Sequence, residues 1–169
     1  MADLFRKLAD EYRDRIYTFA FYSLRGQEEA EDVTQDVLIK MWQHREEIDP
    51  QRMSSWVMRV TRNAVIDVAR RRRTRSAVFA DGVEVEVAAN YVSSDSSAES
   101  SLERREFSES LESALASIEE PYRSIIVMRE IQDMKYAEIV DAVEMPLNTV
   151  KVYLHRGRRM LRDALRGKV

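Results

Sequence analysis

The last quarter of this 169-residue chain carries the pattern that most constrains its fold. The run from Tyr136 to Leu161 has the apolar spacing of a short helix, then a tight turn containing Pro146, then a basic second helix. This arrangement predicts a helix-turn-helix, which places its second helix in the DNA major groove, where base edges carry a distinctive donor and acceptor pattern. Taken alone, the pattern leaves open an ordinary helical hairpin.

The second helix of this pair has two different faces. Val150, Leu154 and Leu161 keep helical spacing, so we expect them to pack on Ile125, Ile139 and Val143. The opposite face would be exposed and able to bind DNA. Its predicted base-reading residues are Asn148, Thr149, Lys151, Val152, His155 and Arg156. Residues predicted to reach phosphates follow on the same helix: Arg158, Arg159 and Arg162.

The net charge of −3 conceals two strongly basic segments. Residues 59–75 contain seven arginines and one acid, and residues 147–169 contain seven bases and one acid, which together make 14 of the 27 basic residues. A single run of this kind usually marks a solvated helix face. Because the two runs end two separate helical units, we favour two contacts with a polyanion.

The N-terminal part shows three amphipathic helical patterns, over about 3–25, 27–44 and from Ser54 or Ser55 onward, with Gly26 ending the first. They predict a compact three-helix domain. The expected inward residues are Leu4, Leu8, Tyr12, Ile16, Phe19, Ala20, Ala30, Val33, Val37, Met41, Trp42, Trp56, Val57, Val60, Ala64 and Val68.

The third of these helices carries a polar stripe opposite its apolar one. Arg59, Asn63, Ile66 and Arg70 recur at steps of three or four residues, and Arg70 to Arg73 close the helix. An Asn amide between arginines can bind a base edge while the cations hold the backbone. The alternative is favourable charge at a helix C-terminus, which explains two arginines more easily than six.

Residues 76–101 differ in character, with a serine-rich run, five acids and no base. We expect a flexible linker, and Val83 to Val87 as a short strand is the alternative. Helical periodicity resumes near Leu102, persists to about Ile118, and starts again after Pro121. The predicted fold is therefore all-α, with two small helical domains on a flexible tether.

The second helix opens with an acidic strip: Glu28, Glu29, Asp32, Gln35 and Asp36. The strip either offsets the helix dipole or docks a basic protein. Cysteine is absent, and the two histidines, His44 and His155, fall in different domains, so we expect no metal site. The sequence has neither a Gly-rich phosphate loop nor a nucleophile pairing, so we expect no enzyme activity and no cofactor. No stretch is apolar enough for a membrane span, and we expect a cytoplasmic location.

These parts, in this order, resemble a bacterial RNA polymerase sigma factor of the extracytoplasmic-function (ECF) group of the sigma-70 family. Residues 30–42 resemble regions 2.1 to 2.2, residues 56–67 resemble regions 2.3 to 2.4, and residues 121–159 resemble region 4. The resemblance implies a region 2 domain of three to four helices over 1–75, a linker over 76–101 and a region 4 helix-turn-helix domain over 102–169.

The resemblance also implies residue roles. Asp32, Gln35 and Asp36 match positions that bind the clamp helices of the largest polymerase subunit. The minus-ten element of the promoter would be bound by Ile48, Arg59, Arg62, Asn63 and Arg70, with Asn63 holding a flipped base and Ile48 in the pocket loop. The minus-thirty-five element would be read by Asn148, Thr149, Lys151, Val152, His155, Arg156 and Arg159.

The chain departs from the family pattern at four places: Asn148 stands where Gly is usual, Val152 where Ser is common, Tyr153 where Arg is common and Val140 where Ala is frequent. These departures leave undetermined which promoter sequence the chain recognises. Val152 and Tyr153 are candidates instead for contacts to thymine methyls or to sugar.

The resemblance predicts a transcription initiation factor whose partners are core RNA polymerase, promoter DNA and an anti-sigma protein, soluble or membrane-bound. Two other hypotheses remain at this point: a conventional repressor or activator that dimerises or senses a ligand, and an adaptor that makes no DNA contact.

Overall fold

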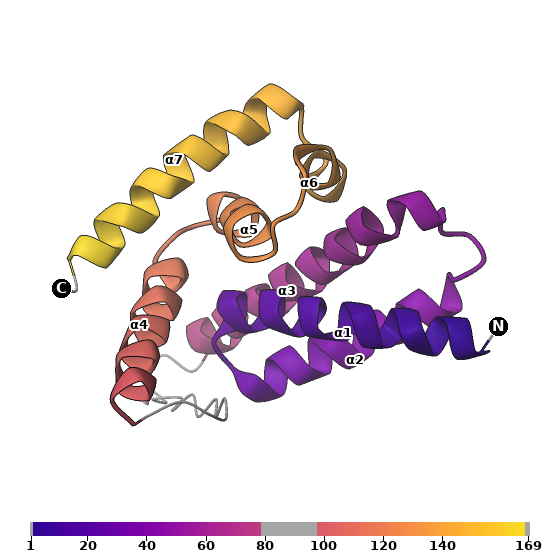
Figure 1. Ribbon diagram of the computed structural model, residues 1–169, viewed down its shortest axis with the longest axis horizontal. Coiled ribbons are helices and arrows are strands. Elements are labelled where there is room, and N and C mark those ends of the chain that lie inside the picture. Colours follow the sequence, from indigo (N-terminus) through magenta and orange to yellow (C-terminus); the bar gives the residue numbers. More distant parts are fainter. Residues whose placement is uncertain (1, 79–97, 168–169) are drawn as a thin grey trace.

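The computed structural model describes residues 2–78 and 98–167, and the regular structure within these ranges is entirely helical (Figure 1). The N-terminal domain consists of α1 (Ala2–Leu24), α2 (Gln27–Gln43), the short 3-10 helix η1 (Pro50–Arg52) and α3 (Met53–Val78). The C-terminal domain consists of α4 (Ala98–Ala116), α5 (Tyr122–Ile126), the π-helical turn η2 (Val127–Ile131), α6 (Tyr136–Val143) and α7 (Leu147–Arg166). The predicted all-α class with two helical domains is confirmed.

The turn between α1 and α2 forms differently from the prediction. We expected Gly26 to end the first helix, but the left-handed residue is Arg25, with φ 57°, and Gly26 is extended, with φ −111°. A Cβ at Gly26 would lie 3.1 Å from Arg72 Nη2, so a larger residue here would require a small shift of the Arg72 side chain. The guanidinium of Arg72 donates to the carbonyl of Leu24 at 2.8 Å and pairs with Glu29, so the end of α3 is tied to this turn.

The core of the N-terminal domain follows the predicted stripes. Fully buried side chains come from α1 (Ile16, Phe19), α2 (Val37, Met41) and α3 (Val57, Met58, Val65). The two tryptophans are exceptions to the prediction. Trp42 remains 42% exposed, with its ring edge on Phe5 and the Arg45 guanidinium 4.1 Å above it, and Trp56 is only partly buried. Large amphipathic rings near a helix end cover the rim of a core more readily than they enter it.

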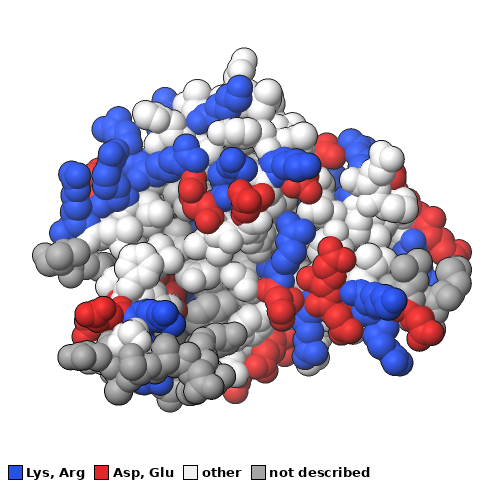
Figure 2. Space-filling model, in the orientation of Figure 1, with Lys and Arg blue, Asp and Glu red and all other residues white. Residues whose placement is uncertain are grey.

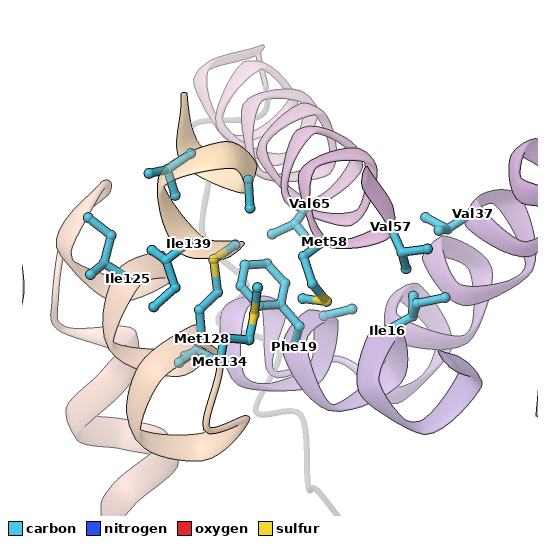
Figure 3. Close-up of a cluster of buried hydrophobic side chains, with 14 of the residues drawn as sticks. Ile16, Phe19, Val37, Val57, Met58, Val65, Ile125, Met128, Met134 and Ile139 are labelled. Carbon is cyan, nitrogen blue, oxygen red and sulfur yellow. The ribbon is translucent and has the colours of Figure 1, made fainter. Parts of the chain in front are cut away.

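The two domains pack against each other through one continuous core. Phe19 of α1 and Met58 of α3 lie in the same buried cluster as Met128 of η2 and Met134, just before α6 (Figure 3). At the edge of this seam, the Gln132 amide donates to the carbonyl of Arg15 at 2.8 Å. The C-terminal domain is thereby held over α1 and α3, with α6 beside α3 (Figure 1).

Helices extend into both ends of the predicted linker of 76–101. Helix α3 continues to Val78, and α4 begins at Ala98 rather than near Leu102. The alternative strand at 83–87 lies outside the described residues. Among the described helices, none is long and apolar enough to cross a membrane.

Candidate nucleic-acid interfaces

Helix α7 buries one stripe and exposes the other. Val150, Leu154 and Gly157 face the domain core, which confirms the first two of the predicted packing residues, while Leu161 is only partly buried. The predicted reading residues lie together on the opposite face: Asn148, Lys151, Val152, His155 and Arg156 are exposed, and Thr149 is half-buried. This face is open to solvent over its whole length.

The distance between α7 and the rest of the domain is determined where α7 crosses α5. A Cβ on Gly157 would lie 2.6 Å from Ile126 Cδ1, so the two helices approach more closely than any side chain there would allow. One turn earlier, the Tyr153 ring packs on Tyr122 with centroids 4.9 Å apart. Tyr153 therefore supports the crossing while its side chain stays partly exposed, and its alternative contact to DNA remains a prediction.

The cations of α7 differ in how far they are already paired. Arg158 is bound to Glu130 of η2, with Nε 2.6 Å from the carboxylate, so it serves the domain as well as the surface. Arg156, Arg159 and Arg162 are exposed and make no ion pair with another described residue. Figure 2 shows Lys and Arg side chains along the edge formed by α7. Such a surface suits a polyanion.

The polar stripe of α3 begins beside α6, at Arg59, and continues past the connection between α4 and α5, which lies near Ile66 and Arg70. Asn63 and Arg70 are exposed, and Arg59, Arg62 and Ile66 are partly buried. Arg59 Nη1 lies 3.5 Å from Glu144 Oε1, and Arg70 pairs at 3.7 Å with Asp67 on its own helix. The Nε atom of Arg62 is buried and has no hydrogen-bond partner among the described residues. The predicted residues are therefore brought onto one face, and part of that face is occupied.

The four arginines at the end of the stripe do not act alike. Arg72 points back to the α1–α2 turn, where it binds Glu29 and the carbonyl of Leu24, and burial lowers its pKa from the ordinary range. Arg70, Arg71 and Arg73 remain exposed. The sequence did not distinguish the structural arginine from its neighbours because its partners are more than forty residues away.

A cleft of about 290 Å³ lies beside this stripe, between the α2–η1 loop, the start of α3 and α6. Its wall includes Ile48, which is 8% exposed, together with Trp56, Arg52 and Arg59, and Asp141 of α6 closes one side. The volume is at the small end for a ligand pocket. An indole, an apolar side chain and two guanidiniums can hold a single base by stacking and charge.

Sequence reasoning missed one of these cleft residues, Trp56, which was assigned to the core because its spacing matched the buried stripe. Arg52 lies at the end of the pocket loop, about Gln43 to Arg52, that the family resemblance implied beside Ile48.

The acidic strip lies on the outer face of α2. Asp32, Gln35 and Asp36 are all exposed, whereas Glu29 is bound by Arg72. Ile39, one turn beyond Gln35, is 54% exposed, so an apolar side chain continues the strip. Sequence reasoning missed Ile39, whose signal was an apolar residue on the polar side of the helix. A charged strip with an apolar residue is a suitable protein-binding surface.

A buried carboxylate lies where α4 meets α1. Glu112 is 6% exposed and accepts a hydrogen bond from the Ser108 hydroxyl at 3.2 Å. Burial raises the pKa of Glu112 above its usual value, while the Ser108 hydrogen bond and the charge of Arg25 oppose this rise. Burial, and then the charge of Glu112, raise the pKa of the neighbouring Tyr22.

Within residues 2–78 and 98–167 there is no group of three or more His, Cys, Asp or Glu side chains that could hold a metal ion. The surfaces described above offer charge, apolar contact and a stacking site. Their arrangement suits binding of DNA and protein rather than transformation of a small molecule.

Two family models match the chain. The family described as Sigma-70 region 2 matches residues 8–75, and the family described as Sigma-70, region 4 matches residues 108–161. Each match covers most of one of the two helical domains, and together they contain the residues assigned above to the three surfaces except Arg162.

Individual relatives extend over nearly the whole chain. ECF RNA polymerase sigma factor SigL of Mycobacterium tuberculosis (strain ATCC 25618 / H37Rv) is 30% identical over 166 residues, which cover 97% of this chain and 90% of the relative. ECF RNA polymerase sigma factor SigW of Bacillus subtilis (strain 168) is 29% identical over 168 residues, with the same coverage of both chains. The sigma factor RpoE, solved in complex with the anti-sigma factor NepR from Bartonella quintana, has a similar fold, with a TM-score of 0.76 at 21% identity and 96% coverage of each chain.

Proposed function

The chain belongs to the ECF RNA polymerase sigma factors of the sigma-70 family, and we propose that each of its three surfaces has one task in transcription initiation. As a member of this family it is a transcription initiation factor, which binds core RNA polymerase and directs it to promoters, and not an enzyme. The proposal concerns which residues carry out each step.

The first task is binding to the polymerase through α2. Asp32, Gln35 and Asp36 bind the clamp helices of the largest subunit, and the exposed Ile39 adds an apolar contact at the end of the strip. The exposure of all four side chains supports this assignment. Glu29 is not part of the surface, because Arg72 already neutralises it.

The second task is capture of the minus-ten element by α3 and the neighbouring cleft. Asn63 and Arg62 contact the flipped base, the cleft between Ile48 and Trp56 receives it, and Arg59 and Arg70 hold the strand. Extrusion of a base costs a few kcal/mol, and stacking with edge contacts offsets that cost. The cleft itself is the observation that carries this assignment, because it combines a stacking surface with cations and includes Arg59, one helical turn before Asn63.

The third task is reading the minus-thirty-five element by α7. Lys151 and Arg156 are the base readers, Asn148, Thr149, Val152 and His155 complete the face, and Arg159 reaches a phosphate. We divide the chain accordingly into region 2 over 1–75, a linker over 76–101 and region 4 over 102–169. An anti-sigma protein that covers these surfaces is the proposed regulator, and the cytoplasm, where the polymerase acts, is the proposed location.

In vitro transcription tests the proposal. Purified core polymerase, genomic DNA of the source cells and the chain are combined, and the 5′ ends of the transcripts are sequenced. We expect a defined set of start sites that share two spaced elements and that disappear without the chain. Promoter-independent transcripts, together with footprinting of a palindrome by the chain alone, would identify a conventional regulator instead.

The α2 assignment is tested by Asp36→Arg, with Glu11→Arg as the matched charge change on the exposed side of α1. Association with core polymerase is measured by fluorescence anisotropy of the labelled chain. We expect Asp36→Arg to weaken binding at least about tenfold, as for one partner of an interface ion pair. Equal affinities for the two variants would remove the clamp assignment.

A further inference from the structure

The acidic end of α6 contacts the basic surface of α3 across the domain boundary. Arg52 Nη2 lies 3.2 Å from both carboxylate oxygens of Asp141, and Arg59 Nη1 lies 3.5 Å from Glu144 Oε1. Asp141 and Glu144 are three residues apart, so both project from the same side of α6 and its C-terminal cap. Two carboxylates from region 4 thus meet two guanidiniums of the minus-ten surface.

We propose that α6 is a built-in competitor of the minus-ten strand: in the free chain Asp141 and Glu144 occupy the cations that bind the strand in the polymerase complex. The inference rests on the proposed function of the α3 surface and adds a regulation to it. In this proposal, the free chain keeps its single-strand surface covered and its duplex-reading surface open, and association with the polymerase separates the domains and exposes the former.

The cleft gives this contact a steric consequence as well as an electrostatic one. Asp141 is itself a wall of the cleft that contains Ile48 and Trp56. A base entering the cleft must therefore displace α6 or accept a carboxylate beside it. Because a phosphate backbone carries the same charge as these carboxylates, strand and α6 compete for Arg52 and Arg59.

The apolar seam explains why α6 stays in this position. Ion pairs as exposed as these contribute only a fraction of a kcal/mol each, because solvent screens them. Phe19, Met58, Met128 and Met134 are fully or almost fully buried between the domains and supply most of the attraction. The two ion pairs then fix which surface α6 covers and make the contact sensitive to salt.

Region 4 remains able to act in this closed form. The predicted reading face of α7 is exposed and lies away from the seam. The free chain is expected to bind duplex DNA weakly through α7 and to bind single strands poorly, although both surfaces are basic. The difference between duplex binding and single-strand binding of the free chain can be measured.

The test uses the full-length chain with Asp141→Asn and Glu144→Gln combined, which removes both charges at nearly constant shape. The matched control is Asp133→Asn with Asp163→Asn, two exposed carboxylates of region 4 that are not paired with region 2. Asn is also well tolerated at position 133, where φ is 50°. Circular dichroism establishes that both variants keep the helical content of the original chain.

Domain separation is followed by energy transfer between dyes. The chain has no cysteine, so Gln51→Cys on η1 and Ala137→Cys on α6 can be labelled specifically, and both positions are exposed. We expect high transfer in the parent chain, a decrease on raising the salt concentration, and a lower value at low salt in the Asp141/Glu144 variant. The control variant should keep the transfer of the parent.

Binding of a fluorescein-labelled pool of short random single-stranded DNA is measured in parallel at low salt. Loss of two exposed ion pairs predicts an affinity about three- to tenfold higher for the Asp141/Glu144 variant than for the control. If the control gains as much affinity as the variant, or if transfer and affinity are unchanged in the variant, the competitor role is wrong. Such a failure leaves promoter-specific transcription with core polymerase intact, so it is distinguishable from failure of the proposed function.

Discussion

The two basic surfaces of this protein are similar in sequence and different in the folded chain. On α7, Lys151, Arg156 and Arg159 are exposed and available to a ligand. On the α3 side, Arg52 and Arg59 are paired with carboxylates of α6 and its C-terminal cap, and Asp141 bounds one side of the cleft beside them. One surface is ready in the free protein, and the other is occupied by the domain that carries the first.

This difference shows why total charge is a poor guide to the DNA-binding state of the chain. The acids that pair with Arg52 and Arg59 come from the helix-turn-helix, far away in sequence, whereas Arg70 and Arg72 pair with acids of the N-terminal domain. The open surface depends on packing within region 4, whereas the closed surface depends on packing between regions 2 and 4. Substitutions that act on one kind of packing should therefore leave the other surface unchanged.

The largest effect is expected for Phe19→Ala, which removes a fully buried ring from the shared core. Replacement of a core Phe by Ala costs about 3–5 kcal/mol. Urea unfolding can be followed by the fluorescence of Trp42 and Trp56, which report region 2 alone, and by circular dichroism, which reports both domains. We expect coincident transitions in the parent chain and a lower, separated region 2 transition in the variant.

Val68→Ala, at a partly buried position of α3, provides the comparison for loss of an apolar side chain in region 2. It should lower stability less and keep the two probes coincident. Two well-separated transitions already present in the parent chain would contradict the shared core and remove the physical basis of the closed surface.

Gly157→Val acts on the open surface only. Its side chain would overlap Ile126 at the α5–α7 crossing, and overpacking of this kind costs about 1–3 kcal/mol. Region 4 should lose stability and binding to promoter duplex should weaken, while Trp fluorescence of region 2 keeps its native emission. Gly167→Val at the end of α7, where a Cβ meets only backbone atoms at 3.7 Å or more, is the matched control. Equal stability of the two variants would disprove the tight crossing.

The sequence predicted this open surface better than the closed one, and the reason is physical. Val150, Leu154 and the reading residues are separated by the helical repeat, so local spacing alone assigns their faces. The pairing of Arg52 with Asp141 joins positions 89 residues apart, and no local pattern encodes it. The same limit applies to Arg72, whose partners lie at the α1–α2 turn, and to Trp42 and Trp56, whose burial depends on what packs above them.

The domain class and the order of the helices were predictable because each helix has its own apolar stripe. The packing of one domain on the other was not, because Met128 and Met134 look like core residues of region 4 alone. Their contact with Phe19 becomes evident only when both domains are placed. The proposed competitor contact therefore depends on the tertiary arrangement. The spacing of Asp141 and Glu144 in the sequence places them on one side of α6 but does not show what they contact.

A smaller effect separates the two DNA contacts themselves. Arg156→Ala should weaken promoter duplex binding by about 1–3 kcal/mol and leave strand opening unchanged, because a lost base contact costs about that much. Asn63→Ala should weaken opening of the promoter in the polymerase complex and leave duplex affinity unchanged. Permanganate reactivity of unpaired thymines measures opening, and footprinting measures duplex binding. If both variants lower both quantities equally, the division of tasks between α3 and α7 is wrong.

The smallest expected effect concerns Glu112, a buried residue of α4 where this helix packs on α1. This contact lies on the other side of region 4 from α6. The raised pKa means that docking favours the protonated carboxyl, so its contribution is most favourable below the ordinary glutamate pKa and is lost as pH rises through the raised value. The charge that forms as the pH rises through the raised pKa opposes docking, and the like charge of Glu109 adds to this, whereas the charge of Arg25 and the hydrogen bond from Ser108 offset it. Glu112→Gln should therefore increase the free energy of unfolding at neutral pH, by less than about 1 kcal/mol, and the gain should disappear in acid.

Urea unfolding at several pH values measures this change, with Glu109→Gln at an exposed position as the control. A loss of stability in Glu112→Gln at neutral pH would mean that the carboxylate is stabilised by Arg25, and that an ion pair contributes to the α1–α4 contact as it does to the α3–α6 contact.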